Sequence, residues 1–153
     1  MKKYFLLFGL FIIGLSSCKK PATFDAAAQA AADDALIQAY IQQHAITAVK
    51  DPSGLYYQII TPGTGAHPND NSNVTVGYTC TLTDGTAIDS RSSAYFAPLG
   101  LTIQGWRTGL PLIGTGGKIL LLVPSALGYG NAAQGAIPAN SVLVYNITLQ
   151  GFN

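Results

Sequence analysis

The spacing of hydrophobic residues changes in the middle of the chain. From Leu99 to Ile103, apolar residues alternate with small or polar ones, which predicts a half-buried strand. Trp106 and Leu110 then stand four residues apart, as on one face of a helix. We therefore expect a strand that runs into a helix of one or two turns, from Gly105 to about Leu112. Because so short a helix is marginal on its own, neighbouring strands must enclose it.

Further strands are expected on both sides of this segment, most clearly where apolar and polar residues alternate and, at residues 118–123, from an apolar run too short for a helix. The expected strands cover residues 55–61, 73–82, 86–89, 118–123 and 141–151. Asp84-Gly85 predicts a tight hairpin turn, and the glycine-punctuated residues 125–140 predict a loop. The expected fold is α+β, with a mostly antiparallel sheet folded around one short helix.

An alanine-rich stretch before these strands predicts a longer helix. Residues 24–49 contain alanine and glutamine but no glycine or proline, and Asp25 is a suitable N-cap. An apolar stripe at helical spacing is formed by Leu36, Ile37, Tyr40 and Ile41. This apolar stripe must pack against another surface. Packing on the rest of the chain is the simpler expectation, and a second copy or a partner protein is the alternative. Asp51-Pro52-Ser53-Gly54 ends the helix and marks an expected domain boundary.

The first 17 residues have the pattern of a signal peptide. Two lysines precede an apolar run from Tyr4 to Leu15, which as a helix is only about 18 Å long, against a hydrocarbon core of about 30 Å. Leu15-Ser16-Ser17-Cys18 resembles the bacterial lipobox, which implies a lipid on Cys18 and a membrane-tethered protein facing the periplasm, with the outer membrane as the first candidate. The alternative is an ordinary secretory leader with an incidental cysteine. The expected division is a leader at 1–17, a tether and helix at 18–51, and a domain at 52–153.

Composition excludes several function classes. The chain has eight Lys and Arg residues against seven acidic residues, all of them Asp, so no nucleic-acid partner is expected. Two histidines and scattered aspartates predict no metal site, no cofactor and no paired carboxylates. Neither a GxSxG motif nor a phosphate-binding loop occurs. Cys80 lies in a predicted strand and is expected to be a buried core thiol without a disulfide partner.

The side chains that remain as candidates for a binding site are aromatic and aliphatic. We expect the indole of Trp106 to form the floor of a cavity. Its expected walls are Tyr78, Ile103, Tyr129, Ile137 and Tyr145. The alternative is a core tryptophan with no site above it.

A series of short motifs occurs in a fixed order along residues 53–153. They are Val74-Thr75-Val76-Gly77-Tyr78-Thr79, Leu82-Thr83-Asp84-Gly85-Thr86 with Asp89-Ser90, Leu99-Gly100, Ile103-Gln104-Gly105-Trp106, Gly116-Gly117-Lys118, Val123-Pro124, Leu127-Gly128-Tyr129-Gly130 and Ile137-Pro138-Ala139-Asn140-Ser141. Together they resemble the FKBP-type peptidyl-prolyl cis-trans isomerases. The resemblance implies a twisted antiparallel sheet wrapped around one short helix, proline-containing polypeptides as substrates and a role in folding exported proteins.

Site roles follow from the resemblance by motif position. Trp106 would be the platform under the proline ring, enclosed by Tyr78, Tyr145 and Ile137. The backbone N–H of Ile103 and the hydroxyl of Tyr129 would each bind a substrate carbonyl. Asp89 would accept a hydrogen bond from Tyr78, and Arg91 is expected to reach it because a buried, unpartnered carboxylate is costly.

The sequence departs from the family pattern where aromatic residues are common. Ile88 and Ala97 stand where phenylalanine is usual, and Ala136 precedes Ile137 where a bulkier residue is frequent. Tyr95 and Phe96, next to Ala97, would compensate for the missing ring. Ile88, Tyr95 and Ala97 are thus expected substrate contacts. The alternative function is a weakly active or inactive FKBP-like binding or chaperone module, and the sequence leaves the oligomeric state open.

Overall fold

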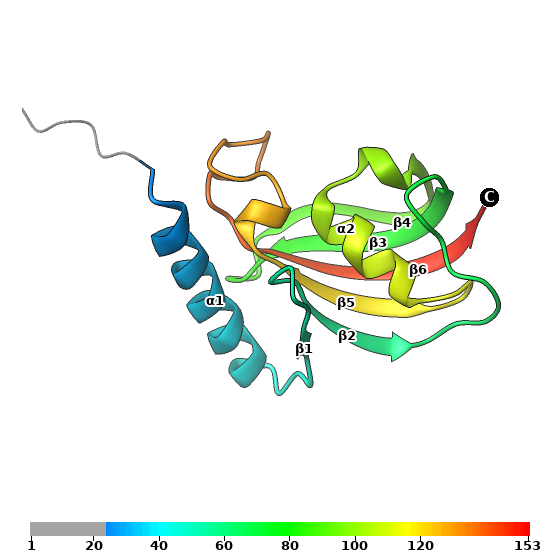
Figure 1. The fold of residues 1–153 in the computed structure, drawn as a ribbon, viewed down its shortest axis with the longest axis horizontal. Helices are drawn as coiled ribbons and strands as arrows, with labels where there is room; N and C mark the ends of the chain where they lie inside the picture. The colour runs from blue at the N-terminus through cyan, green and yellow to red at the C-terminus, as the bar shows by residue number, and fades with distance from the viewer. Residues whose placement is uncertain (1–23) are drawn as a thin grey trace, which may run out of the picture.

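The computed structural model describes residues 24–153, and an antiparallel sheet carries the fold. The elements in order are α1 (Ala26–Gln43), β1 (Val49–Lys50), β2 (Tyr56–Thr61), β3 (Asn73–Leu82), β4 (Ala87–Pro98), η1 (Leu99–Leu101), α2 (Gln104–Gly109), η2 (Leu110–Leu112), β5 (Lys118–Val123), η3 (Ser125–Leu127) and β6 (Leu143–Phe152). Six strands form one sheet in the order β1-β2-β5-β6-β3-β4 (Figure 1). The predicted α+β class is confirmed, whereas the leader and Cys18 lie outside the described residues.

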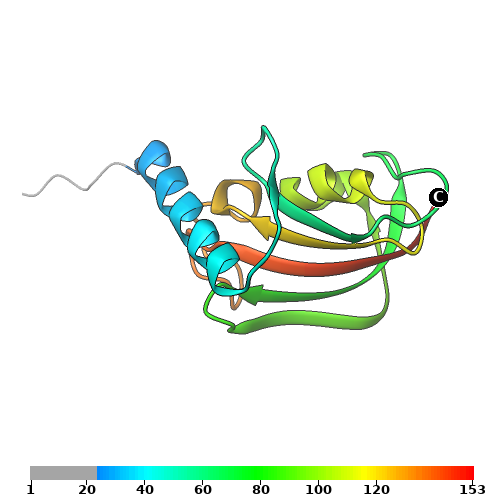
Figure 2. The same cartoon turned by 90° about the horizontal axis from the view of Figure 1, so that it is seen from below.

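Helix α2 lies across one face of the curved sheet, as Figures 1 and 2 show. Two glycines let it approach β5 closely. A Cβ on Gly105 would come within 2.7 Å of Val123 Cγ1, and one on Gly109 within 2.6 Å of Leu121 Cδ2. The side chain between them, Trp106, is only 4% exposed. The main core therefore lies between α2 and the sheet.

The predicted strand at residues 99–103 is wrong. Leu99–Leu101 form a 3-10 turn, closed by hydrogen bonds from the N–H and the hydroxyl of Thr102 to the Leu99 carbonyl at 3.0 and 2.7 Å. Leu99 is fully buried while Leu101 is 86% exposed, so the apolar alternation does not mark one buried face. The chain instead leaves the sheet at Pro98, the last residue of β4.

Strand β4 is longer than the predicted residues 86–89. It pairs with β3 along its length, but the register shifts between Val76 and Tyr78 and again between Cys80 and Thr81. These bulges and the polar run from Ser90 to Ser93 break the alternating pattern, and β4 is an edge strand. The Asp84-Gly85 turn before it is confirmed, with Gly85 at a φ of +88°.

Helix α1 packs on the opposite face of the sheet, so its packing on the rest of the chain is confirmed. Asp25 caps it by accepting the N–H groups of Ala27 and Ala28 at 3.0 Å each. Ile37 is fully buried in a second cluster, which also contains Tyr56, Leu120, Leu122, Val142 and Val144. The predicted stripe is partly wrong, because Leu36 is 48% exposed and Asp33 takes the buried position at 1%.

The helix also ends earlier than Val49. Its last residue is Gln43, and Ala45 follows at a φ of +52°. Val49 and Lys50 then pair with Tyr57 and Tyr56. The helix-breaking residues 51–54 therefore turn the chain back within the same sheet. Within residues 24–153, no helix has both the length and the apolar character needed to cross a membrane.

We expect Gly105→Ala to lower the free energy of unfolding by about 1–3 kcal/mol, because the new methyl group must displace the stiff, buried Val123 side chain. Urea titration followed by circular dichroism measures this change. Gly151→Ala is the matched control, since no atom lies within 4 Å of the position that its new methyl group would take, and it should change stability by less than about 0.5 kcal/mol. Equal effects of the two substitutions would contradict the close-packing argument.

Candidate active site

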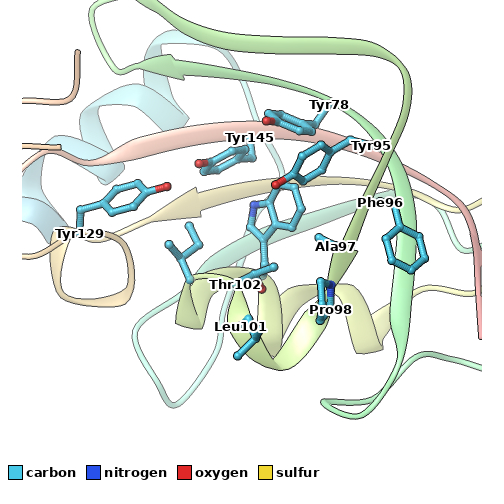
Figure 3. Close-up of a pocket in the computed structure, with 11 residues that line it drawn as sticks. Tyr78, Tyr95, Phe96, Ala97, Pro98, Leu101, Thr102, Tyr129 and Tyr145 are labelled. Atoms are coloured by element: carbon cyan, nitrogen blue, oxygen red, sulfur yellow. The ribbon is translucent and has the colours of Figure 1, made fainter. Parts of the chain in front are cut away.

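A cavity of about 330 Å³ opens beside α2, between the turn that follows β4 and the sheet. Figure 3 shows the 11 residues that line it. They are Tyr78, Tyr95, Phe96, Ala97, Pro98, Leu101, Thr102, Ile103, Trp106, Tyr129 and Tyr145. The cavity draws on strands β3, β4 and β6, on α2 and on the loop after η3, so segments far apart in the sequence meet there.

Four aromatic rings form a continuous cluster in this cavity. The centroid of Trp106 lies 5.2 Å from that of Tyr78 and 5.4 Å from that of Tyr145, at interplanar angles of 80° and 83°. Tyr95 meets Tyr78 edge-on, with centroids 5.6 Å apart. Such edge-to-face pairs contribute about 0.5–1.5 kcal/mol each beyond burial, so they hold the rings in place. Tyr78 thus connects the other three rings, since the centroid of Tyr145 also lies 6.0 Å from its own.

A polar contact fixes Tyr78 from the sheet edge. Its hydroxyl donates to Asp89 Oδ2 at 2.6 Å, while Arg91 Nε lies 3.6 Å from Asp89 Oδ1. Burial first, and then this hydrogen bond, raises the pKa of Tyr78 to about 12. The same hydrogen bond is the main reason why the pKa of Asp89 lies below its usual value. The expected contacts are therefore present, but the expected burial of Asp89 is wrong, because its side chain is 42% exposed.

Tyr145 and Cys80 form the inner side of the cluster. They are register partners on β6 and β3 and are 5% and 1% exposed. Burial raises the pKa of both groups. Both side chains are therefore neutral at physiological pH, and Cys80 is the buried core thiol that was expected. The cavity floor carries no charge from either residue.

Two polar groups at the cavity are available to a ligand. In the part of the chain that the structure describes, the N–H of Ile103 donates to no backbone or side-chain acceptor. The Ile103 carbonyl, by contrast, accepts from the N–H groups of Trp106 and Arg107. Tyr129 is 39% exposed, and its hydroxyl end points toward the cavity in Figure 3. A ligand could therefore be held by apolar contact and by these two donors.

Comparison with known proteins shows to which family the chain belongs. A family model described as FKBP-type peptidyl-prolyl cis-trans isomerase matches residues 64–150. The chain belongs to this family. The match includes every cavity residue named above and leaves α1 outside.

The FKBP-type chain resembles longer relatives over only part of their length. It is 46% identical to the FKBP-type peptidyl-prolyl cis-trans isomerase FkpA of Aeromonas hydrophila over 100 residues, which are 63% of this chain and 37% of that protein. It is 41% identical to the outer membrane protein MIP of Legionella longbeachae over 64% of this chain and 44% of that protein. The crystal structure of Escherichia coli FkpA superposes with a TM-score of 0.73 at 35% identity, covering 83% of this chain and 62% of that one.

The FKBP-type cavity contains most of the predicted site residues, but not all of them. Tyr78, Tyr95, Ala97, Ile103, Trp106, Tyr129 and Tyr145 line it. Asp89 reaches it only through Tyr78, and Ile88 and Ile137 lie outside its lining. Ile88 is the extra residue of the second bulge in β4, and Ile137 is buried in the main core at 7% exposure. Their roles as substrate contacts stay predictions.

Sequence reasoning missed the lining residues Pro98, Leu101 and Thr102, and it named Phe96 only as a replacement for the missing ring. Two of them, Leu101 and Thr102, follow from the misassigned segment, since a turn rather than a strand carries them past the cavity entrance. Tyr95 and Ala97 share one face of β4 while Phe96 points to the other, and its ring lies apart from the other aromatic rings in Figure 3. Of the two residues proposed to replace the missing phenylalanine, Tyr95 therefore has the suitable position.

We expect Tyr78→Phe to raise the pKa of Asp89 toward its ordinary value, because the main cause of its lowered pKa is removed. An NMR titration of the Asp89 carboxyl carbon measures this. Since the folded-state pKa is depressed, the stabilisation by this pair is present above the unfolded-state pKa and is lost as pH falls through the folded-state value. Arg91→Gln, the control, should shift the pKa less, and a larger shift for Arg91→Gln would contradict the assignment.

Proposed function

We propose that this FKBP-type chain is a peptidyl-prolyl cis-trans isomerase that acts on proline-containing polypeptides. The main support for this proposal is the aromatic cavity over Trp106. The N–H of Ile103 and the hydroxyl of Tyr129 lie beside it and are available to a ligand. The cavity's volume of about 330 Å³ leaves room for a proline ring and lies at the lower end of the range for small-molecule pockets, about 300–1,000 Å³. Because the chain spans less than half of the relatives' length, this activity is a proposal for the chain and not a transfer from them.

The proposed chemistry needs no proton transfer. Rotation of a peptide bond crosses a barrier of about 18–20 kcal/mol, and at its top the amide is twisted and has lost its resonance. The carbonyl of the twisted amide carries less charge than that of the planar one, so an apolar cavity favours the twisted form. A millionfold acceleration requires about 8 kcal/mol, to which binding of the residues flanking proline contributes. An uncharged, aromatic wall is suited to this task.

Each cavity group has a proposed role. Trp106 supports the pyrrolidine ring, and Tyr78 and Tyr145 hold the indole from two sides. The Ile103 N–H donates to one substrate carbonyl and the Tyr129 hydroxyl to another. Asp89 acts on the cavity through Tyr78, whose hydroxyl it binds at 2.6 Å. The N–H and the hydroxyl fix the bent chain while the prolyl bond rotates.

A second candidate is a binding module with little isomerase activity. The observation in its favour is the apolar rim, where Phe96 is 59% and Leu101 86% exposed, next to the small Ala97. Such a rim can hold an unfolded segment without enclosing its proline tightly. The two candidates differ in whether bound polypeptide is isomerised faster than in solution.

We expect the chain to accelerate cis-to-trans conversion of a short Ala-Pro peptide in a protease-coupled assay. Trp106→Leu should lower kcat/KM by about tenfold or more, because it removes the aromatic surface under the proline ring but keeps an apolar side chain there. Asp89→Ala should have a smaller effect, since it leaves the Tyr78 ring in place. Tyr40→Leu is the control, because this aromatic residue packs on the other face of the sheet and should leave kcat/KM unchanged.

The same assay separates the two candidates. If the wild-type chain leaves the uncatalysed rate unchanged while it still binds an unfolded protein, the binding module is correct and the isomerase is not. If Trp106→Leu and Tyr40→Leu reduce kcat/KM equally, the cavity is not the site. Thermal melting of both variants shows whether a loss reflects unfolding.

We further propose that the chain is a lipoprotein of the bacterial envelope that faces the periplasm, held by a lipid on Cys18, and that residues 52–153 act as its isomerase domain. The lysine-led apolar leader and its Leu15-Ser16-Ser17-Cys18 ending support this proposal. So does the similarity to a Legionella protein named as an outer membrane protein. Lipid chains on one cysteine would hold the protein durably on a membrane.

In a Gram-negative host, Cys18→Ser should abolish the incorporation of radiolabelled palmitate and move the protein from the membrane fraction to the soluble fraction. The reason is that the proposed acyl chains attach through this thiol. Cys80→Ser, at the other cysteine, should retain both the label and the membrane association, because Cys80 is buried in the core. Label remaining on Cys18→Ser would contradict the lipid assignment.

A further inference from the structure

The backbone on both sides of Tyr129 is held by one carbonyl group that lies outside the cavity. The residues on either side of it, Gly128 and Gly130, both donate their N–H groups to the carbonyl of Ser125, at 3.0 and 2.8 Å. Gly130 in turn accepts the N–H of Asn140 at 2.9 Å. The position of the Tyr129 backbone therefore depends on where Ser125 lies.

Ser125 is itself bound by a residue of the N-terminal helix. Asp33 Oδ2 accepts the backbone N–H of Ser125 at 2.8 Å and its hydroxyl at 2.6 Å. Asp33 and Ser125 are 1% and 2% exposed, although 92 residues separate them in the chain. Figures 1 and 2 both show α1 beside the segment that begins with η3. The contact therefore joins α1 to the start of the Tyr129 loop.

The turn needs this carboxylate because its own sequence supplies no cap. The first N–H groups of a helix lack internal acceptors, and the residue before Ser125 is Pro124, which makes no capping hydrogen bond. Asp33 provides the missing acceptor from another element. Its second oxygen accepts from Gln29 Nε2 at 2.7 Å, so the buried carboxylate is well partnered.

Attachment of α1 to the sheet does not explain Asp33. Ile37 already anchors the helix in the second core cluster. The neighbouring Asp34 accepts hydrogen bonds from Lys50 Nζ and the Tyr56 hydroxyl at 2.6 and 2.7 Å, both in the β1–β2 hairpin. Of these three helix residues, Asp33 is the one bound to the turn that leads to Tyr129.

We propose that Asp33 is a positioning residue for Tyr129, acting through Ser125 and the two glycine N–H groups. Helix α1, which lies outside the matched family region, thereby sets the geometry of one cavity wall. This inference rests on the proposed isomerase function, because Tyr129 is taken to bind a substrate carbonyl. It predicts that changes at Asp33 alter catalysis only as long as the Tyr129 hydroxyl is present.

A double-mutant cycle in the full chain tests the proposal, using the proline-peptide assay. Asp33→Asn keeps the size of the side chain but removes the charge, and it should lower kcat/KM about three- to tenfold. Tyr129→Phe should lower it by a similar factor, and Asp33→Asn should then cause no further loss in the Tyr129→Phe background. Asp34→Asn, the same change one residue along, is the control and should leave kcat/KM unchanged.

Amide hydrogen exchange gives a readout that does not depend on activity. Asp33→Asn should speed exchange at Gly128 and Gly130 by about tenfold, because their common acceptor is less firmly held, whereas Asp34→Asn should not. Thermal melting of each variant identifies losses that come from unfolding.

The outcomes separate this inference from the proposed function. Additive effects of Asp33→Asn and Tyr129→Phe, or unchanged exchange at Gly128 and Gly130, would overturn the positioning role even if the wild type is a good isomerase. An inactive wild type would overturn the isomerase. In that case, faster exchange together with weaker binding of the peptide by Asp33→Asn would still support the positioning role of Asp33. Unchanged peptide binding by Asp33→Asn would overturn that role.

Discussion

The close packing of α2 on β5 is the constraint on which the rest of the structure depends. Gly105 and Gly109 have no side chains, so the helix comes close enough to touch Val123 and Leu121 directly. This approach fixes the height of Trp106 above the sheet, and Tyr78 and Tyr145 then meet the indole edge-on from β3 and β6. A helix of six residues, too short to be stable alone, is thus held by the sheet and in return provides the centre of the cavity.

Charge is kept at the margin of this cavity. Asp89, the acidic residue that touches the aromatic cluster, is bound to the outer end of Tyr78 and stays partly in water. The inner tyrosine, Tyr145, is neutral because burial raises its pKa. The N–H of Ile103 and the hydroxyl of Tyr129 are uncharged donors. This separation gives an apolar interior with a few fixed polar contacts, which matches the demands of a reaction without proton transfer.

Much of the fold and of the site could be predicted from local pattern and from motifs. A short apolar run identified β5, whose residues after Lys118 are all buried. Alternation identified β3 and β6. The same rule failed at residues 99–103, where a turn closed by Thr102 gives the same spacing of apolar residues. The aromatic residues of the cavity lie within recognisable motifs, whereas Leu101 has no motif that marks its exposure. The role of Asp33 could not be predicted from the sequence, because a lone acidic residue in a helix is usually solvated. Only its hydrogen bonds to the distant Ser125 account for its burial.

The irregular edge of the sheet limits how an extended chain can pair with it. An extended chain can add itself as a further strand to a straight edge with unpaired N–H and C=O groups. Strand β4 borders both the open edge of the sheet and the cavity, but its two register shifts interrupt the regular array of hydrogen-bonding groups. An extended chain that lies beside the aromatic rings therefore meets an edge that offers no regular ladder for a seventh strand.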